Sequence, residues 1–278
     1  MSQKRYAFIT GAASGIGQAT AELFADQGFW IGAADLNAEG LAELRAALGE
    51  DRCGTWRLDV TDKAAYDRTI AEVAEVTGGR LDLLYNNAGI GAAGFFEDIP
   101  FETTLAIVNV NLLGVLNGIH AAITLLKATP GSLCFSTSSS AATYGAPNLA
   151  VYAATKFAVK GLTEALAVEL SRADVRVADV LPGLIDTPIL TSPRYVDGRQ
   201  ESADGRTIGA NAPTEGPFRL IPPSMVAEAV WKAYSGDPRM HWYVPDEIEE
   251  IDKQKTVSPE NTRDERIRMM QAGLELPE

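Results

Sequence analysis

Short apolar runs rich in β-branched and aromatic residues alternate along the chain with stretches of helical periodicity. The runs are typical of buried strands, and the stretches between them are typical of amphipathic helices. One helical stretch is long, from about Phe101 to Leu126. The strand-like runs are RYAFIT, FWIGAAD, GTWRLDV, LDLLYNN, SLCFSTS, VRVADVLPG and HWYV. This alternation predicts a single α/β domain, in which a doubly wound parallel sheet of about seven strands carries helices on both faces.

Two segments depart from the alternation. The segment from Pro188 to Pro223 is rich in Gly, Pro and polar residues and is longer than most loops in compact domains. Because it follows the end of a strand, we predict that it is a lid over the functional site. The segment after Val244 is charged, with a short helix around Thr262 to Ala272, and is either a solvated tail or an arm that packs on a partner subunit. The expected parts are a domain over residues 1–244, with its lid at about 188–223, and an extension over residues 245–278.

Composition and charge narrow the classes of function. The 278 residues carry 24 Lys and Arg against 37 Asp and Glu, which disfavours nucleic acid and anionic membranes as partners. No run of about eighteen apolar residues predicts a membrane span, and the N-terminus lacks a signal-peptide pattern. Cys53 and Cys134 lie in different predicted strands, which favours free thiols and a reducing, cytoplasmic setting. Neither cysteine shares a zinc-ligand spacing with a histidine, so no metal site is expected.

A glycine-rich turn joins the first strand to the first helix in FITGAASGIGQATAELFADQG. Glycines let such a turn approach a pyrophosphate closely, while the helix N-terminus offers free N–H groups to the anion. By itself the pattern would also fit a merely tight strand-to-helix turn. Its place after the first strand predicts a dinucleotide-binding loop of the Rossmann type. The residues expected to contact the cofactor there are Gly11, Ser14, Gly15, Ile16 and Gly17.

The second strand-like run ends in Asp35, which predicts a preference for NAD over NADP. A carboxylate at this place accepts hydrogen bonds from the ribose hydroxyls of NAD and repels the 2′-phosphate of NADP. Ser14, Leu36 and Asn37 surround the same ribose in this interpretation, and all three are neutral. Asp35 could also cap the helix that follows, and the two roles are compatible. We therefore expect Asp35 and Leu36 among the cofactor-binding residues.

Tyr152 and Lys156 lie four residues apart in VYAATKFAVKG, on one face of a predicted helix. Alone, the pair could be a buried ring beside a lysine whose stem packs on the protein surface. Together with the glycine loop and with NNAG at residues 86–89, it resembles the compact branch of the short-chain dehydrogenase/reductase family. The resemblance covers about residues 4–244. It implies an NAD-dependent oxidoreductase that interconverts a secondary alcohol and a ketone.

Further cofactor contacts follow from the resemblance, motif by motif. RLDV matches the family's pair at the adenine, and NNAG matches the wall beside the adenosine ribose. VNVNLLGV matches the helix near the nicotinamide, and LPGLIDTP matches the turn that holds the carboxamide. The residues implied are Asp59, Val60, Asn87, Ala88, Gly89, Val110, Tyr152, Lys156, Pro182, Gly183, Ile185 and Thr187.

The same resemblance implies the catalytic residues Asn111, Ser139, Tyr152 and Lys156. Asn109 is an alternative to Asn111, but Asn111 stands in the N-x-x-G register. Ser138 and Ser140 are alternatives to Ser139, which is thirteen residues before the tyrosine, as in the family.

The roles implied are acid/base chemistry at Tyr152, positioning of the substrate oxygen by Ser139, and a water held by Asn111. A free tyrosine has a pKa of about 10, and one ammonium about 4 Å away favours the phenolate by about 4 kcal/mol at an effective dielectric near 20. We therefore expect Lys156 to lower the pKa of Tyr152 and to hold the ribose.

Substrate and assembly are less closely specified. We expect GIGAAGF, Ala141 with GAPNL, and the lid from Pro188 to form the walls of the substrate pocket. Their small apolar residues predict a roomy site for a neutral secondary alcohol or ketone, unless an arginine of the lid closes inward. The residues concerned are Ala92, Ala93, Ala141, Leu149, Leu184, Arg194, Arg199 and Arg206. The alternatives are an NADPH-type 3-oxoacyl reductase and a nucleotide-sensing protein without turnover. The resemblance also implies a homodimer or homotetramer built through the helix that bears Tyr152 and the long helix before it.

Overall fold

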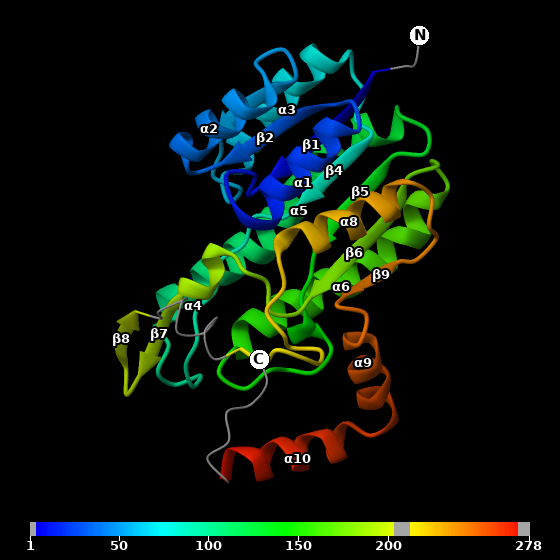
Figure 1. Ribbon diagram of the computed structural model, residues 1–278. Helices are drawn as coiled ribbons and strands as arrows, with labels where there is room; N and C mark the ends of the chain where they lie inside the picture. The colour runs from blue at the N-terminus through cyan, green and yellow to red at the C-terminus, as the bar shows by residue number, and fades with distance from the viewer. Residues whose placement is uncertain (1–3, 203–211, 272–278) are drawn as a thin grey trace.

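Seven parallel strands form the central sheet of the protein, whose computed structural model describes residues 4–202 and 212–271. Their order across the sheet is β3-β2-β1-β4-β5-β6-β9, as Figure 1 shows. Each strand overlaps one of the predicted runs, so the doubly wound α/β fold is confirmed. The strands are β1 (Arg5–Thr10), β2 (Phe29–Asp35), β3 (Cys53–Arg57), β4 (Leu83–Asn86), β5 (Leu133–Thr137), β6 (Arg176–Pro182) and β9 (His241–Val244).

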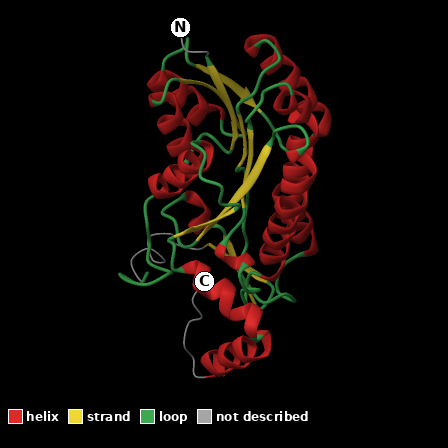
Figure 2. Cartoon of the chain, turned by 90° about the vertical axis from the view of Figure 1, so that its right-hand side faces the viewer, coloured by secondary structure: helices red, strands yellow, loops and turns green. Residues whose placement is uncertain are grey.

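Helices cover both faces of this sheet, in the two layers that flank the strands in Figure 2. Buried side chains of α1, α2 and α8 form one hydrophobic core with the sheet, and those of α3, α5 and α6 form a second core on the opposite face. The helices are α1 (Gly15–Asp26), α2 (Ala38–Leu48), α3 (Lys63–Thr77), α4 (Phe101–Val108), α5 (Gly114–Lys127), α6 (Ala150–Ser171) and α8 (Pro223–Tyr234).

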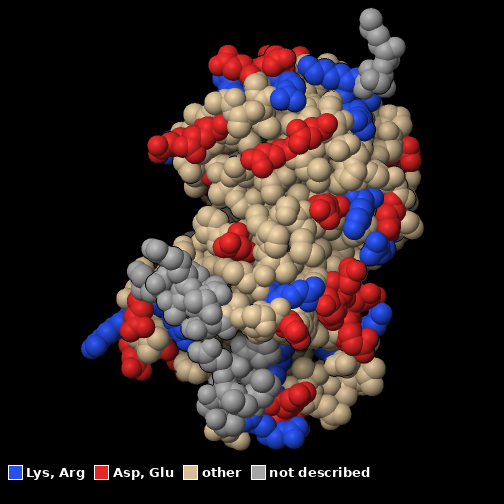
Figure 3. Space-filling view, in the orientation of Figure 1, with Lys and Arg blue, Asp and Glu red and all other residues tan. Residues whose placement is uncertain are grey.

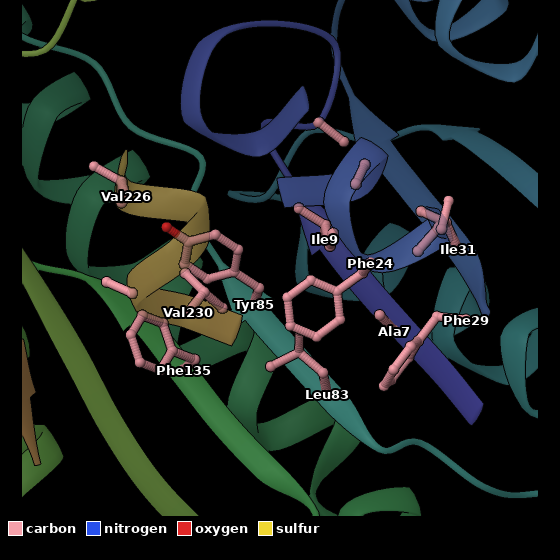
Figure 4. Packing of buried hydrophobic residues seen from close by; sticks show 14 of the residues in the cluster. Ala7, Ile9, Phe24, Phe29, Ile31, Leu83, Tyr85, Phe135, Val226 and Val230 are labelled. Atoms are coloured by element: carbon pink, nitrogen blue, oxygen red, sulfur yellow. The ribbon is translucent and has the colours of Figure 1, made fainter. Parts of the chain in front are cut away.

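Side chains of β1 point alternately to the two faces of the sheet and so contribute to both hydrophobic cores. Ala7 and Ile9 belong to the first core and Phe8 to the second, as expected for side chains that point to opposite faces of a strand. In the first core Phe24 of α1 and Val230 of α8 pack over the strands (Figure 4). Burying one such aromatic or branched side chain contributes about 1.5–3 kcal/mol to stability. These cores fix the strand ends that carry the site.

The strand order reverses between β1 and β4. From β1 the chain moves outward through β2 to β3, and then returns to β4 on the other side of β1. At such a reversal the connections leave the carboxyl ends of the strands in opposite directions and open a crevice. The glycine loop and the NNAG motif follow β1 and β4, so both lie at this crevice.

The long helix predicted from Phe101 to Leu126 is divided in the structure. Residues Asn109–Leu113 form a π-helical segment, η1, between α4 and α5. By length and composition the whole run Phe101–Lys127 could cross a membrane. Buried residues of α5 nevertheless belong to the second core, so the run serves as a helix of the folded domain.

The segment predicted to be an irregular lid contains regular structure. A short 3-10 helix, η3 (Pro188–Thr191), is followed by the antiparallel hairpin of β7 (Pro193–Val196) and β8 (Arg199–Ser202). Ala93 forms an isolated bridge with Arg194, so the hairpin is tied to the segment after β4. The sequence pattern predicted a lid here but did not predict the hairpin. Residues 203–211 of this segment lie outside the described part of the chain.

The C-terminal extension forms two helices, α9 (Ile248–Val257) and α10 (Pro259–Gln271), which extend below the sheet in Figure 1. Lys160 of α6 pairs with Asp252 of α9, and Lys255 lies 4.4 Å from the ring centroid of Phe157. Only the second helix was predicted. The first was missed because its stabilising partners are on α6.

Two further predictions concern cysteines and metals. Cys53 on β3 and Cys134 on β5 are buried free thiols, as expected. Within residues 4–202 and 212–271, no group of three or more His, Cys, Asp or Glu side chains could hold a metal ion.

Candidate active site

The glycine loop after β1 has the geometry of a phosphate cradle. Gly11 and Gly15 adopt positive φ angles of 65° and 53°, which favour glycine. A Cβ atom on Gly17 would lie 2.0 Å from the carbonyl oxygen of Gly11, so only glycine lets α1 pack this close to the loop. Ser14 stands at the N-cap of α1 without a side-chain capping bond. The N–H groups at the start of α1 therefore fit a pyrophosphate.

Asp35 lies at the end of β2, beside this loop. Its Oδ2 accepts the N–H of Ala13 at 3.1 Å, and its Oδ1 accepts the N–H of Asn37 at 2.9 Å. The N-cap of α2 is Asn37, whose side chain accepts the N–H of Gly40 at 3.1 Å. Asp35 is thus not the helix cap that the sequence left open as an alternative. Its carboxylate is fixed at the rim of the crevice.

The NNAG turn after β4 is held by a threonine that the sequence did not single out. The hydroxyl of Thr10 accepts the N–H of Asn87 at 3.0 Å, and the Asn87 amide donates to the carbonyl of Thr10 at 3.1 Å. Thr137 of β5 donates its hydroxyl to Oδ1 of Asn87 at 3.0 Å. The hydroxyls at the strand ends thus position the predicted ribose wall.

Asn111 lies in the π-helical segment and is fully buried. Its side-chain amide and the backbone of Ile90 exchange two hydrogen bonds, each 2.9 Å long. Such π-helical turns are frequent at functional sites, because the extra residue re-aims a side chain. Asn109, the alternative, is only partly buried, and no side-chain hydrogen bond forms from it within the described residues. The geometry favours Asn111.

The serine, the tyrosine and the lysine converge at the end of β5. The hydroxyl of Ser139 lies close enough to Tyr152 to favour its phenolate, and it accepts the N–H of Ala141 at 3.1 Å. Ser138 donates to the backbone carbonyl of Lys156 at 2.9 Å, so its hydroxyl is engaged by α6. Lys156 Nζ donates to the carbonyl oxygen of Thr137 at 2.8 Å and lies 5.5 Å from the centroid of the Tyr152 ring. Ser139 is therefore the serine that meets the tyrosine.

Burial dominates the ionisation of this pair. It raises the pKa of Tyr152 above its ordinary value, and the nearby Ser139 hydroxyl offsets the rise only in part. Burial also lowers the pKa of Lys156 to about 8. The expectation that Lys156 lowers the pKa of Tyr152 was wrong for this arrangement. The ammonium is bound by Thr137 and lies near the ring, and desolvation outweighs its charge.

A cavity of about 810 Å³ connects the glycine loop, Asp35 and the Tyr152 side chain. Figure 3 shows the surface hollowed between the part of the molecule that carries α2 and the part that carries β7. Gly17 and Asn111 do not line the cavity, because each lies behind its wall. The predicted residues that line it are Gly11, Ser14, Gly15, Ile16, Asp35, Leu36, Asp59, Val60, Asn87, Ala88, Gly89, Val110, Ser139, Tyr152, Lys156, Pro182, Gly183, Ile185 and Thr187.

The substrate end of this cavity agrees with the prediction in part, because Ile90 and Gly91 of GIGAAGF and several residues of the lid line it. None of Ala92, Ala93, Ala141, Leu149 and Leu184 lines the cavity. Its walls come from α4 and the lid, because the hairpin packs against α4 and Tyr195 hydrogen-bonds Thr103 at 3.1 Å. Arg194 and Arg199 are exposed and do not line it, and Arg206 is outside the described residues. The residues found there are Glu102, Thr103, Ala106, Ile189, Leu190, Ser192, Pro193, Tyr195 and Gln200.

Comparison with known proteins gives consistent matches. Residues 5–195 match the family model described as short chain dehydrogenase. A 3-oxoacyl-[acyl-carrier-protein] reductase of Thermotoga maritima is 39% identical over 184 residues, which are 65% of this chain and 74% of the relative. An L-2,3-butanediol dehydrogenase of Corynebacterium glutamicum is 36% identical over 215 residues, 74% of this chain and 81% of the relative.

Solved structures match over a greater length. The 3-ketoacyl-(acyl-carrier-protein) reductase of Brucella melitensis, solved as a complex with NADH, superposes with a TM-score of 0.75 at 29% identity. The match covers 88% of this chain and 98% of that structure. This structural match therefore covers more of the chain than the family-model match over residues 5–195.

Proposed function

The chain belongs to the short-chain dehydrogenase/reductase family, and from this membership we propose that it interconverts a neutral secondary alcohol and a ketone with NAD as the hydride carrier. The observation that carries the proposal is the placement of Ser139, Tyr152 and Lys156 in one cavity with the glycine loop and Asp35. A cavity of about 810 Å³ has room for both a dinucleotide and a substrate.

The chain's residues fit NAD along the length of this cavity. The start of α1 would hold the pyrophosphate, Asp35 the adenosine ribose, and Lys156 the ribose next to the nicotinamide. Pro182, Gly183, Ile185 and Thr187 would hold the carboxamide. When bound, the nicotinamide supplies the hydride chemistry, and the protein supplies orientation and proton transfer.

Tyr152 is the proposed acid/base. Since burial raises the pKa of Tyr152, the phenol keeps its proton near neutral pH and is suited to donate it from Oη to a ketone oxygen. The Ser139 hydroxyl, which lies beside the tyrosine and lines the same cavity, would hold the same oxygen in place. In the direction of alcohol oxidation Tyr152 would accept the proton of the alcohol, with the Lys156 ammonium 5.5 Å from the centroid of its ring.

Asn111 is a positioning residue in this proposal. Its amide is occupied by Ile90 on one side, and Nδ2 is also 3.4 Å from the hydroxyl of Thr155 on α6. It therefore fixes α6 relative to the segment after β4, at the residue directly before Lys156. A water that relays the proton to solvent would be held in the same region.

A neutral substrate agrees with the walls of the cavity. Lys156 is the one Lys or Arg among the described lining residues, and Glu102 adds a negative charge. A carboxylate or phosphate on the substrate would therefore lack a cationic partner. The second candidate is a 3-oxoacyl reductase, which the Thermotoga and Brucella relatives favour. Initial rates with a 3-oxoacyl thioester and with 2,3-butanediol or cyclohexanol would separate the two.

The experiment on the proposed chemistry is Tyr152→Phe. We expect kcat for alcohol oxidation to fall by about a thousandfold, the size of a lost general acid/base, while the Kd of NADH stays within about twofold. Tyr144→Phe is the matched control, because Tyr144 does not line the cavity. A Tyr152→Phe enzyme with wild-type kcat contradicts the mechanism. Binding of NADH with no turnover on a broad panel of alcohols and ketones would favour a nucleotide-sensing protein.

Location and assembly complete the proposal. Two buried free thiols agree with a reducing compartment, and we infer that the protein is cytoplasmic. A homodimer or homotetramer through α5 and α6 would cover the exposed apolar side chains Leu116 and Val168.

A further inference from the structure

Arg57 lies beside the residue that selects the nucleotide. It ends β3, and in the parallel register of β2 and β3 it is the direct partner of Asp35. Residues directly opposite in a sheet project to the same face, on strands about 4.8 Å apart. The Arg57 Nε donates to the carbonyl oxygen of Leu36 at 3.4 Å, so the guanidinium reaches the backbone next to Asp35.

The charge of Arg57 is not neutralised by a neighbour. Among residues 4–202 and 212–271 no carboxylate lies within ion-pair distance of Arg57, and its side chain is exposed. β3 is the edge strand, so no further strand covers the guanidinium. Asp35, in contrast, holds two backbone N–H groups with its two oxygens. The fixed carboxylate of Asp35 and the exposed guanidinium of Arg57 therefore lie side by side at the end of the cavity expected to hold the adenosine.

Resting on the proposed function, we propose that Arg57 is a second determinant of cofactor selectivity, which binds the 2′-phosphate of NADP(H) and limits the discrimination imposed by Asp35. Asp35 and Leu36 both line the cavity, and Arg57, which does not line it, is joined to the backbone of Leu36, so its guanidinium lies at the edge of the place expected for the ribose. Guanidinium binds phosphate through paired N–H donors and keeps its charge at any physiological pH. NAD offers no group at this place that needs such a cation.

Two consequences distinguish this arrangement from selection by Asp35 alone. The wild-type protein binds NADPH measurably, although less tightly than NADH. Removing the charge of Asp35 strengthens NADPH binding only while Arg57 is present, because the cation then acts without an opposing carboxylate. The effects of the two substitutions on NADPH binding are therefore expected to be non-additive, and their effects on NADH binding additive.

A double-mutant cycle with direct binding as the readout tests the proposal. Dissociation constants for NADH and NADPH would be measured by nucleotide fluorescence for the wild type, Arg57→Gln, Asp35→Asn and the double variant. We expect Arg57→Gln to weaken NADPH binding by about tenfold, as for one charge-assisted hydrogen bond, and to leave NADH within about twofold. Asp35→Asn should tighten NADPH binding, and Asp35→Asn with Arg57→Gln should lose that gain.

Arg172→Gln is the charge-matched control, since Arg172 is exposed, ends α6 and does not line the cavity. Adenosine 2′,5′-bisphosphate against AMP isolates the 2′-phosphate from the rest of the dinucleotide. The proposal is overturned if Arg57→Gln changes NADH and NADPH binding by the same factor, or if it leaves both unchanged. Nucleotide binding is measured without substrate, so this test does not depend on the proposed alcohol chemistry. If that chemistry is wrong, the protein will show no turnover, but its dissociation constants for NADH and NADPH will still differ.

Discussion

At the scale of single residues, Gly118 marks a point where no side chain fits. A Cβ atom there would lie 2.3 Å from Asn86 Oδ1 and 2.5 Å from the Tyr66 hydroxyl. Both polar groups are buried and lack hydrogen-bond partners among the described residues. Gly118→Ala would force them apart within a packed core. We expect the free energy of unfolding to fall by about 1–3 kcal/mol, as for other overpacked cores, in urea denaturation followed by circular dichroism.

Gly161→Ala is the control for that prediction. Gly161 also lies inside a helix, α6, but it is exposed and a Cβ atom would meet nothing within 4 Å. Alanine there should raise the free energy of unfolding by about 0.5–1 kcal/mol through helix propensity. Equal effects of the two substitutions would show that contact with Asn86 and Tyr66 is not the cause.

His241 is a single residue that makes stability depend on pH. Burial opposes its protonation, but the 2.7 Å hydrogen bond of Nδ1 to Asp179 and the nearby Glu164 outweigh burial and Lys160, and raise its pKa. A raised histidine pKa stabilises the folded state below the unfolded pKa, and the contribution is lost as pH rises through the folded value. The free energy of unfolding should therefore fall as the pH rises above about 6.5 and through the raised pKa of the folded state.

His241→Gln tests this assignment, because glutamine keeps a donor for Asp179 but does not titrate. The slope of unfolding free energy against pH should flatten in this variant. Urea titrations at a series of pH values measure it, and an unchanged slope would assign the pH dependence to other groups.

At the scale of elements, the sequence predicted those helices, strands and turns that depend on interactions between residues close together in the chain. The strands β1 and β2 were predictable because their runs are almost entirely buried. The pair of Tyr152 and Lys156 was predictable because one helix turn brings the two side chains together. The glycine loop was predictable because its backbone and its packing on Gly11 require glycine at fixed spacings.

What was missed depends on contacts between distant segments. Thr10 and Thr137 position Asn87 only after three strands have met at their ends. The π-helical turn at Asn111 is stabilised by Ile90, twenty-one residues earlier. The hairpin of the lid pairs with Ala93, and α9 rests on Lys160. The pattern of residues within each segment carries no information about partners elsewhere in the chain. The sequence therefore predicted which residues bear the chemistry better than it predicted the backbone structure around them.

The lid hairpin leads to a prediction at the same scale. Gly94 has a φ angle of 153°, and a Cβ atom there would lie 2.7 Å from the carbonyl oxygen of Tyr195. Gly94→Ala should loosen the attachment of β7 and expose the backbone near Arg194 and Arg199 to trypsin. We expect cleavage there to be about tenfold faster, read by mass spectrometry of limited digests. Gly145→Ala, with open space around its Cβ, should digest like the wild type.

At the scale of the whole molecule, surface charge and exposed apolar groups set different limits on partners. The net charge of −13 is spread among interspersed acidic and basic side chains on the face shown in Figure 3. The negative net charge disfavours nucleic acid as a partner. Exposed apolar side chains occur along α4, η1, α5 and α6, and η1 and α4 both pack against α6. They are Phe101, Leu105, Leu113, Leu116 and Val168.

The last prediction concerns association through these helices. Val168, on α6, is 76% exposed and belongs to the group of exposed apolar side chains on these helices. If α5 and α6 meet a second copy, Val168→Asp places an unpaired carboxylate in a buried interface at a cost of several kcal/mol. We expect the dissociation constant of the oligomer to rise by at least about a hundredfold in sedimentation velocity. Val76→Asp on α3, where the side chain is 53% exposed, changes the charge equally and should associate as the wild type does. Equal association of all three proteins would place the interface on another surface, and Leu116→Asp then separates a contribution of α5 from one of α6.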